Sequence, residues 1–412
     1  MSAVSNGARR RRIALVGAGL AAARLAQQFL ELGGEAELTL YGAEARPAYN
    51  RVLLADVLSG RYDPEAITLP YGEPGARLRT GTEVVAVDVS ARTLRLANGE
   101  TAAYDELVLA TGANPVLPPL RGLYADGELT AGVHSFRTLA DCARLTEDAV
   151  RAQRAVVIGG GVLGVSAARA LAALGLPVEI VHQAPHLIER HLDEQAGQAL
   201  RRGLLALGVD VYPGNRARAL HGDGRVTGVE LANGYVLAAD LVVIACGARP
   251  RTGLAHSAGL AVRRGVVVDD HLATSAPGVY AIGDCVEHRA TVHGLAGPAW
   301  EQADVLAARL SGADPAARYT GSRPLARLTA GPLEYAAFGE VGEDLPDTDV
   351  LRLADATRGS YKKLVLRGDR LVGGILLGDL GTVGALTRAY ERDDPLPADP
   401  LHLLITQGAA QW

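Results

Sequence analysis

Apolar residues occur along the chain in short runs, and one arrangement of these runs appears twice. An apolar run at residues 13–16 is followed by a glycine-rich turn, a helical stretch and a second strand that ends near residue 42. The same order of strand, turn, helix and strand occupies residues 156–183. Buried strands joined through helices predict an α/β fold with parallel sheets. The repeated pattern predicts two Rossmann-like dinucleotide-binding domains.

The first of these units has the glycine spacing of a phosphate-binding turn. Gly17 permits the tight turn, Gly19 lets a diphosphate approach the backbone, and Ala22 is small enough for the helix to pack on the strand. The helix N-terminus adds free amides and the positive end of the helix dipole. Glu44, just beyond the second strand, can accept hydrogen bonds from a ribose. We therefore predict a dinucleotide site here, with an ordinary tight turn as the alternative.

The second unit has the same spacing, with Gly159, Gly161 and Gly164. Its second strand ends differently, because such units commonly place Asp or Glu there to hold the adenosine ribose. This chain has His182 at that position, for which a half-exposed strand-end histidine is one interpretation. Two more histidines follow, but nothing near them completes a ligand set, and we expect no metal.

Three further segments, each a strand that ends in a glycine turn, support FAD at the first unit. Residues 104–115 (YDELVLATGANP) and 239–250 (ADLVVIACGARP) each run from an apolar strand into a glycine turn. Residues 279–288 place Asp284 after a strand-end glycine, where its carboxylate can bond ribityl hydroxyls. The second unit lies between the first and third of these segments. This order predicts FAD at the first unit and a nicotinamide nucleotide at the second, with hydride passing from nicotinamide to flavin.

Composition narrows the class of protein further. Hydrophobic residues make up 48% of the chain and charged residues 21%, which is enough for a sizeable core. The net charge of −5 gives no electrostatic case for nucleic-acid binding. No segment is apolar for long enough to span a membrane, and a glycine turn interrupts the first apolar stretch. We therefore expect a cytoplasmic protein with neither a membrane span nor a signal peptide.

The cysteines exclude several kinds of site. Cys142, Cys246 and Cys285 are far apart and form no CxxC pair. They cannot build a disulfide framework or a four-cysteine iron–sulfur site, and they fit a reducing compartment. Residues 20–130 contain no cysteine, which argues against a disulfide reductase and against cysteine-dependent NADH oxidases and peroxidases.

Four longer segments resemble one family of flavoproteins. These segments are RPAYNRVLLADVLSG, VEIVHQAPHLIERHLD, VEHRATVHGLAGPAWEQA and YKKLVLRGDRLVGGILLGD. Together with the glycine motifs they resemble two-dinucleotide-binding-domain reductases, over nearly the whole chain. Within that family they are similar to the flavin-containing front half of the assimilatory NADH nitrite reductase large subunit. They are equally similar to the electron-transfer subunit of assimilatory nitrate reductase.

The resemblance implies a cofactor pair and a role for one histidine. It implies FAD and NADH, and it implies that His182 bonds the adenosine ribose, because the nitrite-reductase type also has histidine there. We expect NADH to be preferred over NADPH, since Arg190 is the nearest arginine that could take a 2′-phosphate. Neutral His182 does not repel phosphate as a carboxylate would, so the expected preference is modest.

Two positions depart from the ferredoxin-reductase relatives, which usually pair a Lys and a Glu beside the flavin N5. Asp56 occupies the Lys position and Ser166 the Glu position. Because both charges are replaced together, we expect that neither is left buried without a partner. Proton handling near the flavin must therefore differ, and no catalytic acid is assigned.

The expected function is that of an NADH-dependent, FAD-containing electron-transfer reductase in assimilatory nitrate or nitrite reduction. Since the sequence ends at Trp412 without iron–sulfur or sirohaem modules, electrons are expected to pass to a separate protein. That acceptor is expected to hold an iron–sulfur, molybdenum or sirohaem centre. A rubredoxin or ferredoxin reductase is the first alternative. A nucleotide-sensing flavoprotein that binds a partner with little turnover is the second.

The expected layout has an NAD-binding domain inserted into an FAD-binding domain. The FAD domain takes residues 1–120 and 250–320, the NAD domain 121–249, and a small β-rich α+β interface domain 321–412. The residues expected to bind FAD are Gly17, Gly19, Leu20, Ala21, Ala22, Glu44, Arg51, Val84, Ala110, Thr111, Gly112, Gly283, Asp284, Ala299 and Trp300. The residues expected to bind NAD are Gly159, Gly161, Val162, Leu163, Gly164, His182 and Gly247.

Overall fold

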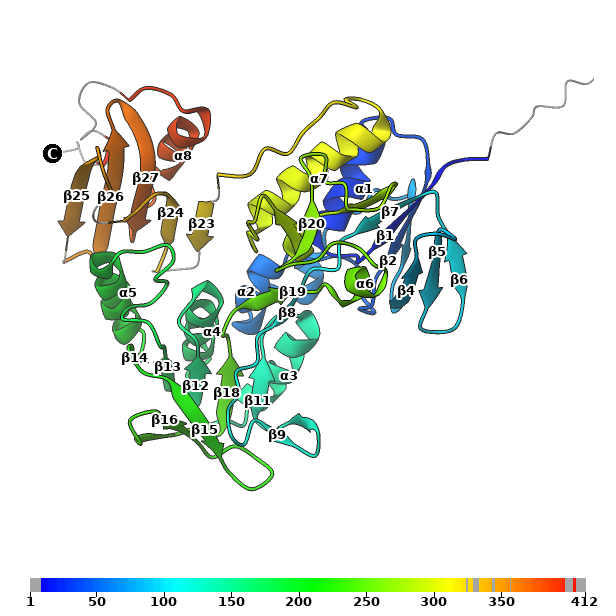
Figure 1. Ribbon diagram of the computed structural model, residues 1–412. Helices are drawn as coiled ribbons and strands as arrows, with labels where there is room; N and C mark the ends of the chain where they lie inside the picture. The colour runs from blue at the N-terminus through cyan, green and yellow to red at the C-terminus, as the bar shows by residue number, and fades with distance from the viewer. Residues whose placement is uncertain are drawn as a thin grey trace, which may run out of the picture. The chain divides into compact units, whose positions relative to one another are not determined.

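The computed structural model describes residues 9–323, 325–328, 333–342, 345–355, 357–396 and 403–404. Its contacts divide the chain into two compact units. Unit 1 consists of Met1–Val52, Pro64–Asn114 and Ala248–Ser322, and unit 2 of Leu53–Asp63, Pro115–Gly247 and Arg323–Trp412. Each unit contains a five-stranded parallel sheet with helices (Figure 1), which confirms the predicted α/β class. The predicted domain boundaries stay a prediction, and parts of the last predicted domain lie outside the described residues.

The central sheet of unit 1 has the strand order β21-β7-β1-β2-β3, and every neighbouring pair is parallel. Its strands are β1 (Arg12–Val16), β2 (Glu37–Tyr41), β3 (Ala76–Arg79), β7 (Glu106–Leu109) and β21 (Val279–Ala281). Apolar residues of β1 and β7 are buried along almost their whole length, as expected for a parallel sheet covered on both faces. Helices α1 (Leu20–Glu31) and α7 (Ala296–Ser311) pack against each other in this unit.

Smaller elements complete unit 1. A three-stranded antiparallel sheet contains β4 (Val84–Asp88), β5 (Thr93–Leu96) and β6 (Thr101–Ala103). The other elements are η1 (Arg51–Leu53), η2 (Pro64–Ile67), β8 (Ala113–Pro115), β19 (Ala248–Pro250), α6 (Gly253–Ser257), β20 (Val266–Val268), η3 (Gly283–Cys285) and β22 (Val286–His288). Strand β20 pairs with β22, and β8 pairs with β19 where the chain passes from one unit to the other.

The parallel sheet of unit 2 has the strand order β11-β18-β12-β13-β14. Its strands are β11 (Val133–Ser135), β12 (Ala155–Ile158), β13 (Val178–Val181), β14 (Val209–Tyr212) and β18 (Leu241–Ile244). The helices of this part are α2 (Leu54–Leu58), α3 (Leu139–Ala149), α4 (Val162–Ala173) and α5 (Glu194–Ala206). A β-ribbon, β9 (Tyr124–Ala125) with β10 (Glu128–Leu129), and a small sheet, β15 (Ala217–His221), β16 (Gly228–Leu231) and β17 (Val236–Ala238), complete it.

The C-terminal part of unit 2 is a five-stranded antiparallel sheet with its own apolar core. Its spatial order is β23-β24-β27-β26-β25, and α8 (Val383–Arg392) packs on β27. The strands are β23 (Leu325–Leu328), β24 (Tyr335–Gly339), β25 (Asp349–Asp355), β26 (Ser360–Arg367) and β27 (Arg370–Leu377). Strand β26 also contacts α5, so the sheet is tied to the parallel-sheet part of the same unit.

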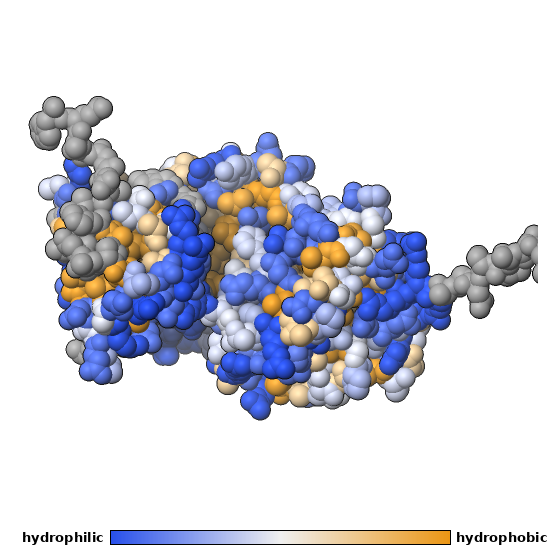
Figure 2. Space-filling model, turned by 90° about the horizontal axis from the view of Figure 1, so that it is seen from above, coloured by the Kyte–Doolittle hydropathy of each residue, from blue (hydrophilic) through white to orange (hydrophobic). Residues whose placement is uncertain are grey.

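The face shown in Figure 2 is largely hydrophilic, with smaller hydrophobic areas between the hydrophilic residues. No helix in the described part of the chain is both long enough and apolar enough to cross a membrane.

Candidate dinucleotide-binding sites

Residues predicted to bind FAD follow the ends of neighbouring parallel strands in unit 1. Gly17 and Gly19 follow β1, Glu44 follows β2, Ala110 follows β7 and Gly283 follows β21. These strands pair in register, so their carboxyl ends meet at one edge of the sheet. Open α/β sheets bind ligands at this edge. The fold therefore brings together residues that are separated by up to 266 positions in the sequence.

The two glycines of the turn after β1 have different surroundings: Gly17 has no room for a side chain, whereas Gly19 borders open space. Gly17 has φ +108°, and a Cβ atom there would lie 2.1 Å from the carbonyl oxygen of Ala110. Only glycine fits this position, because the chain after β7 crosses directly against the turn. A Cβ on Gly19, by contrast, would meet no protein atom within 4 Å. Leu20 and Ala21 then open α1, while Ala22 is fully buried in the core.

The N-terminus of α1 is suited to an anion. Its N-cap residue, Gly19, provides no side-chain hydrogen bond, and the first turn contains no acidic residue. The open space at this glycine lies where backbone amides point outward with the positive end of the helix dipole. The residues present therefore fit the diphosphate of a dinucleotide.

A polar cluster forms directly after β2. The Glu44 carboxylate accepts a hydrogen bond from the Tyr49 hydroxyl at 2.7 Å and forms an ion pair with Arg51. The Arg51 guanidinium lies 5.0 Å from the centre of the Tyr49 ring. Two predicted site residues thus contact each other, and Tyr49 is a member of the cluster that the sequence analysis missed. Its signal was its place between the two, in the segment RPAYNR.

The segments after β7 and β21 complete the same edge of the sheet. The Thr111 hydroxyl donates to the carbonyl of Arg251 at 2.8 Å, and the Gly112 carbonyl accepts from the Arg251 N–H at 2.9 Å. Gly283 donates its N–H to the Gln302 side chain on α7 at 2.7 Å, and Asp284 follows it in η3. Helix α7 is thereby fixed beside these turns.

The remaining predicted FAD residues lie at two other places in unit 1. Ala299 and Trp300 lie in the first turns of α7, with Ala299 buried and Trp300 exposed. Val84 opens β4. The preceding Thr82 N–H donates to the Gly42 carbonyl at 2.7 Å, so the start of β4 is near the end of β2.

Unit 2 repeats the glycine turn at the end of β12. Gly159 has φ +115°, and a Cβ there would lie 2.3 Å from the carbonyl oxygen of Ala245. A Cβ on Gly164 would lie 1.9 Å from the Gly159 carbonyl oxygen, so helix α4 packs directly on the turn. Gly161 again faces open space, with no protein atom within 4 Å of a Cβ and no side-chain cap on α4. These residues fit a second diphosphate.

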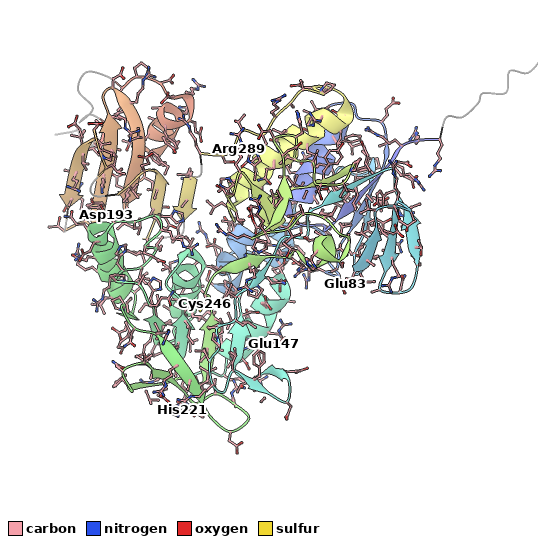
Figure 3. All side chains as sticks on the ribbon, viewed as in Figure 1. Glu83, Glu147, Asp193, His221, Cys246 and Arg289 are labelled. Atoms are coloured by element: carbon pink, nitrogen blue, oxygen red, sulfur yellow. The ribbon has the colours of Figure 1, made fainter. Side chains whose placement is uncertain are left out.

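The other predicted NAD residues lie near this turn. Val162 and Leu163 form the start of α4 and are partly exposed. Gly247, with φ +101°, follows β18, whose end pairs with the end of β12. Figure 3 labels the neighbouring Cys246 beyond β18. The individual contacts of these residues with a nucleotide stay a prediction.

His182 follows β13 and is buried, with 8% of its side chain exposed. Its Nδ1 accepts the Gly160 N–H at 3.1 Å, and its Nε2 lies 3.0 Å from the Glu189 carboxylate. The histidine is therefore more than an unpaired residue at a strand end, because it links the glycine turn to an acid. The sequence analysis missed Glu189, since it comes seven positions after the strand-end histidine and no spacing rule points to it.

The structure gives the Asp56 position a charged partner that the sequence analysis did not name. Asp56 is 5% exposed, and its carboxylate lies 3.7 Å from the Arg169 guanidinium, one helical turn beyond Ser166 on α4. Burial lowers the pKa of Arg169 below its ordinary value, and Asp56 opposes that effect. Ser166 instead donates to the Val162 carbonyl at 2.7 Å. A charge pair of opposite orientation therefore joins α2 to α4.

A second buried ion pair anchors the loop that follows His182. Asp193 accepts the Ala196 N–H at 2.9 Å as the N-cap of α5, labelled in Figure 3. Its other oxygen accepts from the Tyr361 hydroxyl at 2.7 Å and from the Lys363 ammonium at 3.1 Å. Burial raises the pKa of Asp193, but these three donors outweigh it and lower the pKa overall. The glycine-turn part of unit 2 is thus bonded to β26.

None of the three cysteines has a lowered pKa. Burial raises the pKa of the Cys142 thiol to about 11 and also raises that of Cys285, and desolvation raises the pKa of Cys246, an exposed residue, to about 11. A nucleophilic cysteine requires a lowered pKa.

No group of three or more His, Cys, Asp or Glu residues able to hold a metal ion occurs among the described residues.

Two glycine turns open at the carboxyl ends of two parallel sheets define an oxidoreductase that binds two dinucleotides. Comparison with known proteins agrees. The family model described as "Pyridine nucleotide-disulphide oxidoreductase" matches residues 11–303, and the model "Rubredoxin NAD+ reductase C-terminal domain" matches residues 324–393. The chain belongs to the pyridine nucleotide-disulphide oxidoreductase family. It is an FAD-dependent NAD(P)H oxidoreductase, and the prediction of FAD and NAD as cofactors is confirmed.

Two relatives from Bacillus subtilis (strain 168) are similar over 90% of the chain. The chain is 38% identical to "Nitrite reductase [NAD(P)H]" and 36% identical to "Assimilatory nitrate reductase electron transfer subunit". These alignments cover 46% and 48% of the relatives, so the chain spans about half their length. The recognised family resemblance is confirmed.

A solved structure supports the fold. The structure titled "Crystal Structure of Ferredoxin Reductase for the CYP199A2 System from Rhodopseudomonas palustris" has a TM-score of 0.84 and 25% identity to the chain. The alignment covers 93% of the chain and 95% of that structure. The same architecture is therefore found in a reductase that serves a ferredoxin.

Proposed function

We propose that the chain is the NADH-oxidising flavoprotein of an assimilatory nitrate or nitrite reductase system, located in the cytoplasm. The observation that carries this proposal is the 36–38% identity, over 90% of the chain, to the two Bacillus subtilis nitrogen-oxyanion proteins. An alignment over 90% of the chain necessarily includes the second glycine turn and part of the C-terminal antiparallel sheet. The chain's role in such a system would be to take electrons from NADH and deliver them to a metal centre.

The residues of the chain support binding and positioning in this reaction. Bound FAD would accept a hydride from a nicotinamide nucleotide and pass electrons on singly. The turns at Gly17–Gly19 and Gly159–Gly161 would hold the two diphosphates, and Glu44 would bind the FAD adenosine ribose. Asp284 would bond the ribityl hydroxyls. Because all three thiols have raised pKa values, no cysteine relay is assigned to the path.

The proposed acceptor carries an iron–sulfur, molybdenum or sirohaem centre. Reduction of nitrite to ammonia takes six electrons, and nitrate reduction is an oxygen-atom transfer, so both chemistries call for a metal. The chain has three cysteines, and they lie after different strands or within a helix rather than together. We expect the acceptor to dock transiently near the segment GPAWEQA, where Trp300 is exposed.

The test uses the purified chain with and without a candidate acceptor. We expect a yellow protein with one FAD that reduces ferricyanide with NADH but reduces neither nitrate nor nitrite by itself. Addition of a molybdenum- or sirohaem-containing subunit should start NADH-dependent reduction of the oxyanion. Reduction of nitrate or nitrite by the chain alone would contradict the proposal. Absence of any NADH-dependent ferricyanide reduction would favour the nucleotide-sensing alternative.

A rubredoxin or ferredoxin reductase is the second candidate function. It is favoured by the match of residues 324–393 to the rubredoxin-reductase C-terminal model. It is also favoured by 36% identity over 276 residues to "Biphenyl dioxygenase system ferredoxin--NAD(+) reductase component" from Paraburkholderia xenovorans (strain LB400). Fast reduction of a rubredoxin or ferredoxin, combined with no activity toward the oxyanion-reducing subunits, would decide for this candidate.

A further inference from the structure

The imidazole of His182 has a defined proton position. Its Nδ1 is 3.1 Å from the backbone nitrogen of Gly160, and a backbone N–H can only donate. The Nδ1 atom must therefore be the acceptor, and the proton of the neutral ring is on Nε2. That proton points to Glu189, whose carboxylate oxygen lies 3.0 Å away. Both ring nitrogens therefore have partners within the protein. Through the second of these contacts, the Glu189 carboxylate is held near the end of β13.

The loop that carries Glu189 is fixed against the glycine turn. The Ile188 N–H donates to the Gly160 carbonyl at 2.9 Å, and Ile188 itself has φ +54°. A Cβ on Gly160 would lie 2.7 Å from the His182 ring and 2.4 Å from Leu187, so turn, ring and loop are closely packed. A β-branched residue in the left-handed region is strained and persists only where surrounding contacts impose it. The position of Glu189 is therefore set by the fold.

The acid of this pair is accessible and the histidine is not. The Glu189 side chain is 36% exposed, whereas His182 is 8% exposed. A carboxylate has room for about four hydrogen bonds, and the imidazole takes one of them. The end of the second strand is the place where such units hold the adenosine ribose. The Glu189 carboxylate contacts the strand-end side chain, His182. It therefore lies one imidazole ring farther from the strand than an acid at position 182 would.

We propose that Glu189 binds the adenosine ribose of NADH and disfavours the 2′-phosphate of NADPH, with His182 as its positioning residue. This inference rests on the proposed NADH-oxidising function and names the residue that sets its nucleotide preference. The carboxylate accepts hydrogen bonds from ribose hydroxyls, which is a charge-assisted interaction. A 2′-phosphate would bring a second negative group against it and be repelled. The discriminating acid thus comes from the loop after β13.

The test measures binding rather than turnover, with 5′-AMP and 2′,5′-ADP as probes of the adenosine site in the FAD-loaded full chain. Isothermal titration should show tighter binding of 5′-AMP by the unchanged protein. Glu189→Gln should weaken 5′-AMP binding about 10-fold, since the ribose hydroxyls would then donate to a neutral amide oxygen instead of a carboxylate. It should weaken 2′,5′-ADP less or not at all. Glu194→Gln is the matched control, because Glu194 is exposed on α5, accepts from the Gln198 side chain at 3.2 Å, and should leave both affinities unchanged.

The positioning role requires a second variant. His182→Ala should reduce the preference for 5′-AMP, and in the Glu189→Gln background it should change that preference no further. An unchanged preference in Glu189→Gln, or an equal loss for both probes, would overturn the assignment while leaving the proposed function intact. Failure of the unchanged protein to bind either probe, and to bind NADH, would overturn both.

Discussion

The two glycine turns of this protein share one backbone design, but the strand ends beside them differ. Gly17 and Gly159 have φ +108° and +115°, and both would drive a Cβ into a carbonyl oxygen of the neighbouring crossover segment. After β2, the Glu44 carboxylate contacts Tyr49 and Arg51 directly. After β13, the corresponding residue is His182, and the carboxylate is that of Glu189, which contacts the histidine ring. The two turns therefore share one backbone conformation, while the polar side chains that follow the second strand differ between the units.

A second matched pair stands at the opposite end of the sheets. Asp105 precedes β7 and accepts from the backbone and the guanidinium of Arg12, at 2.8 Å and 3.0 Å. Asp240 precedes β18 and accepts the backbone N–H groups of Gln153 and Arg154, at 2.9 Å and 3.0 Å. Each aspartate fixes the start of the strand that leads into the glycine turn of its unit, β1 in unit 1 and β12 in unit 2. Within the described part of the chain, Asp105 also forms an ion pair, with Arg12, whereas Asp240 has none.

The largest effect should come from filling the two strained glycines. Gly17→Ala and Gly159→Ala each place a Cβ within 2.3 Å of a carbonyl oxygen, at a φ that favours glycine. We expect a local cost above about 4 kcal/mol in each case. Gly17→Ala should yield protein without flavin. Gly159→Ala should keep its flavin and lose reduction by NADH. Flavin absorbance and anaerobic NADH titration would check this, and an equal loss of flavin in both variants would break the correspondence between the turns.

The free energy of unfolding should fall by about 3 kcal/mol when Asp193, at the end of the loop after β13, is replaced. Asp193→Ala leaves the Lys363 ammonium, which is fully buried, without this carboxylate and removes the α5 N-cap. Asp193→Asn keeps a capping oxygen and should cost less. Because the pKa of Asp193 is lowered, its contribution is complete above the ordinary value of 3.8 and is lost as pH falls below it. Urea unfolding at pH 7 and pH 3 measures both effects. Equal stability of the two variants would argue against a capping effect, and an unchanged advantage of the unaltered protein over Asp193→Asn at pH 3 would argue against a charge effect.

A smaller, ligand-specific effect should come from the two open glycines. Gly19→Ala and Gly161→Ala meet no protein atom within 4 Å, so neither should change the free energy of unfolding of the ligand-free chain by more than about 1 kcal/mol. Each new methyl group should instead block the approach of a diphosphate. We expect about 10-fold weaker binding of FAD in the first variant and of NADH in the second. Wild-type affinities in both would show that the ligands approach elsewhere.

The smallest effect concerns the two aspartates. Donation from Arg12 lowers the pKa of Asp105 to about 2. Its ion pair therefore stabilises the fold fully above the ordinary value of 3.8 and loses that contribution as pH falls toward 2. Since the side chain is about one-third exposed, we expect Asp105→Asn to cost under about 1 kcal/mol at pH 7. Asp240→Asn serves as the matched variant without an ion pair. Acid titration of stability would show a steeper loss in unchanged protein than in Asp105→Asn.

The sequence by itself determined the architecture and most of the cofactor-binding turns. Buried strands next to glycine turns are local patterns, because a tight turn and a close helix contact require small residues at fixed spacing. The ends of β7 and β21 could also be read, since each is an apolar strand followed by a glycine. The predicted α/β class and the FAD and NAD cofactors follow from such local signals and are confirmed.

Only the tertiary structure decided which charges meet. Asp56 and Arg169, Asp193 and Lys363, and His182 and Glu189 come together through packing of α2 on α4, of β26 on α5, and of a loop on a turn. No spacing rule links such residues, because the distance between them along the chain is unrelated to their distance in the fold. Sequence reasoning found a missing Lys–Glu pair at Asp56 and Ser166. It could not find the opposite pair one helical turn away, since burial is a property of the assembled helices.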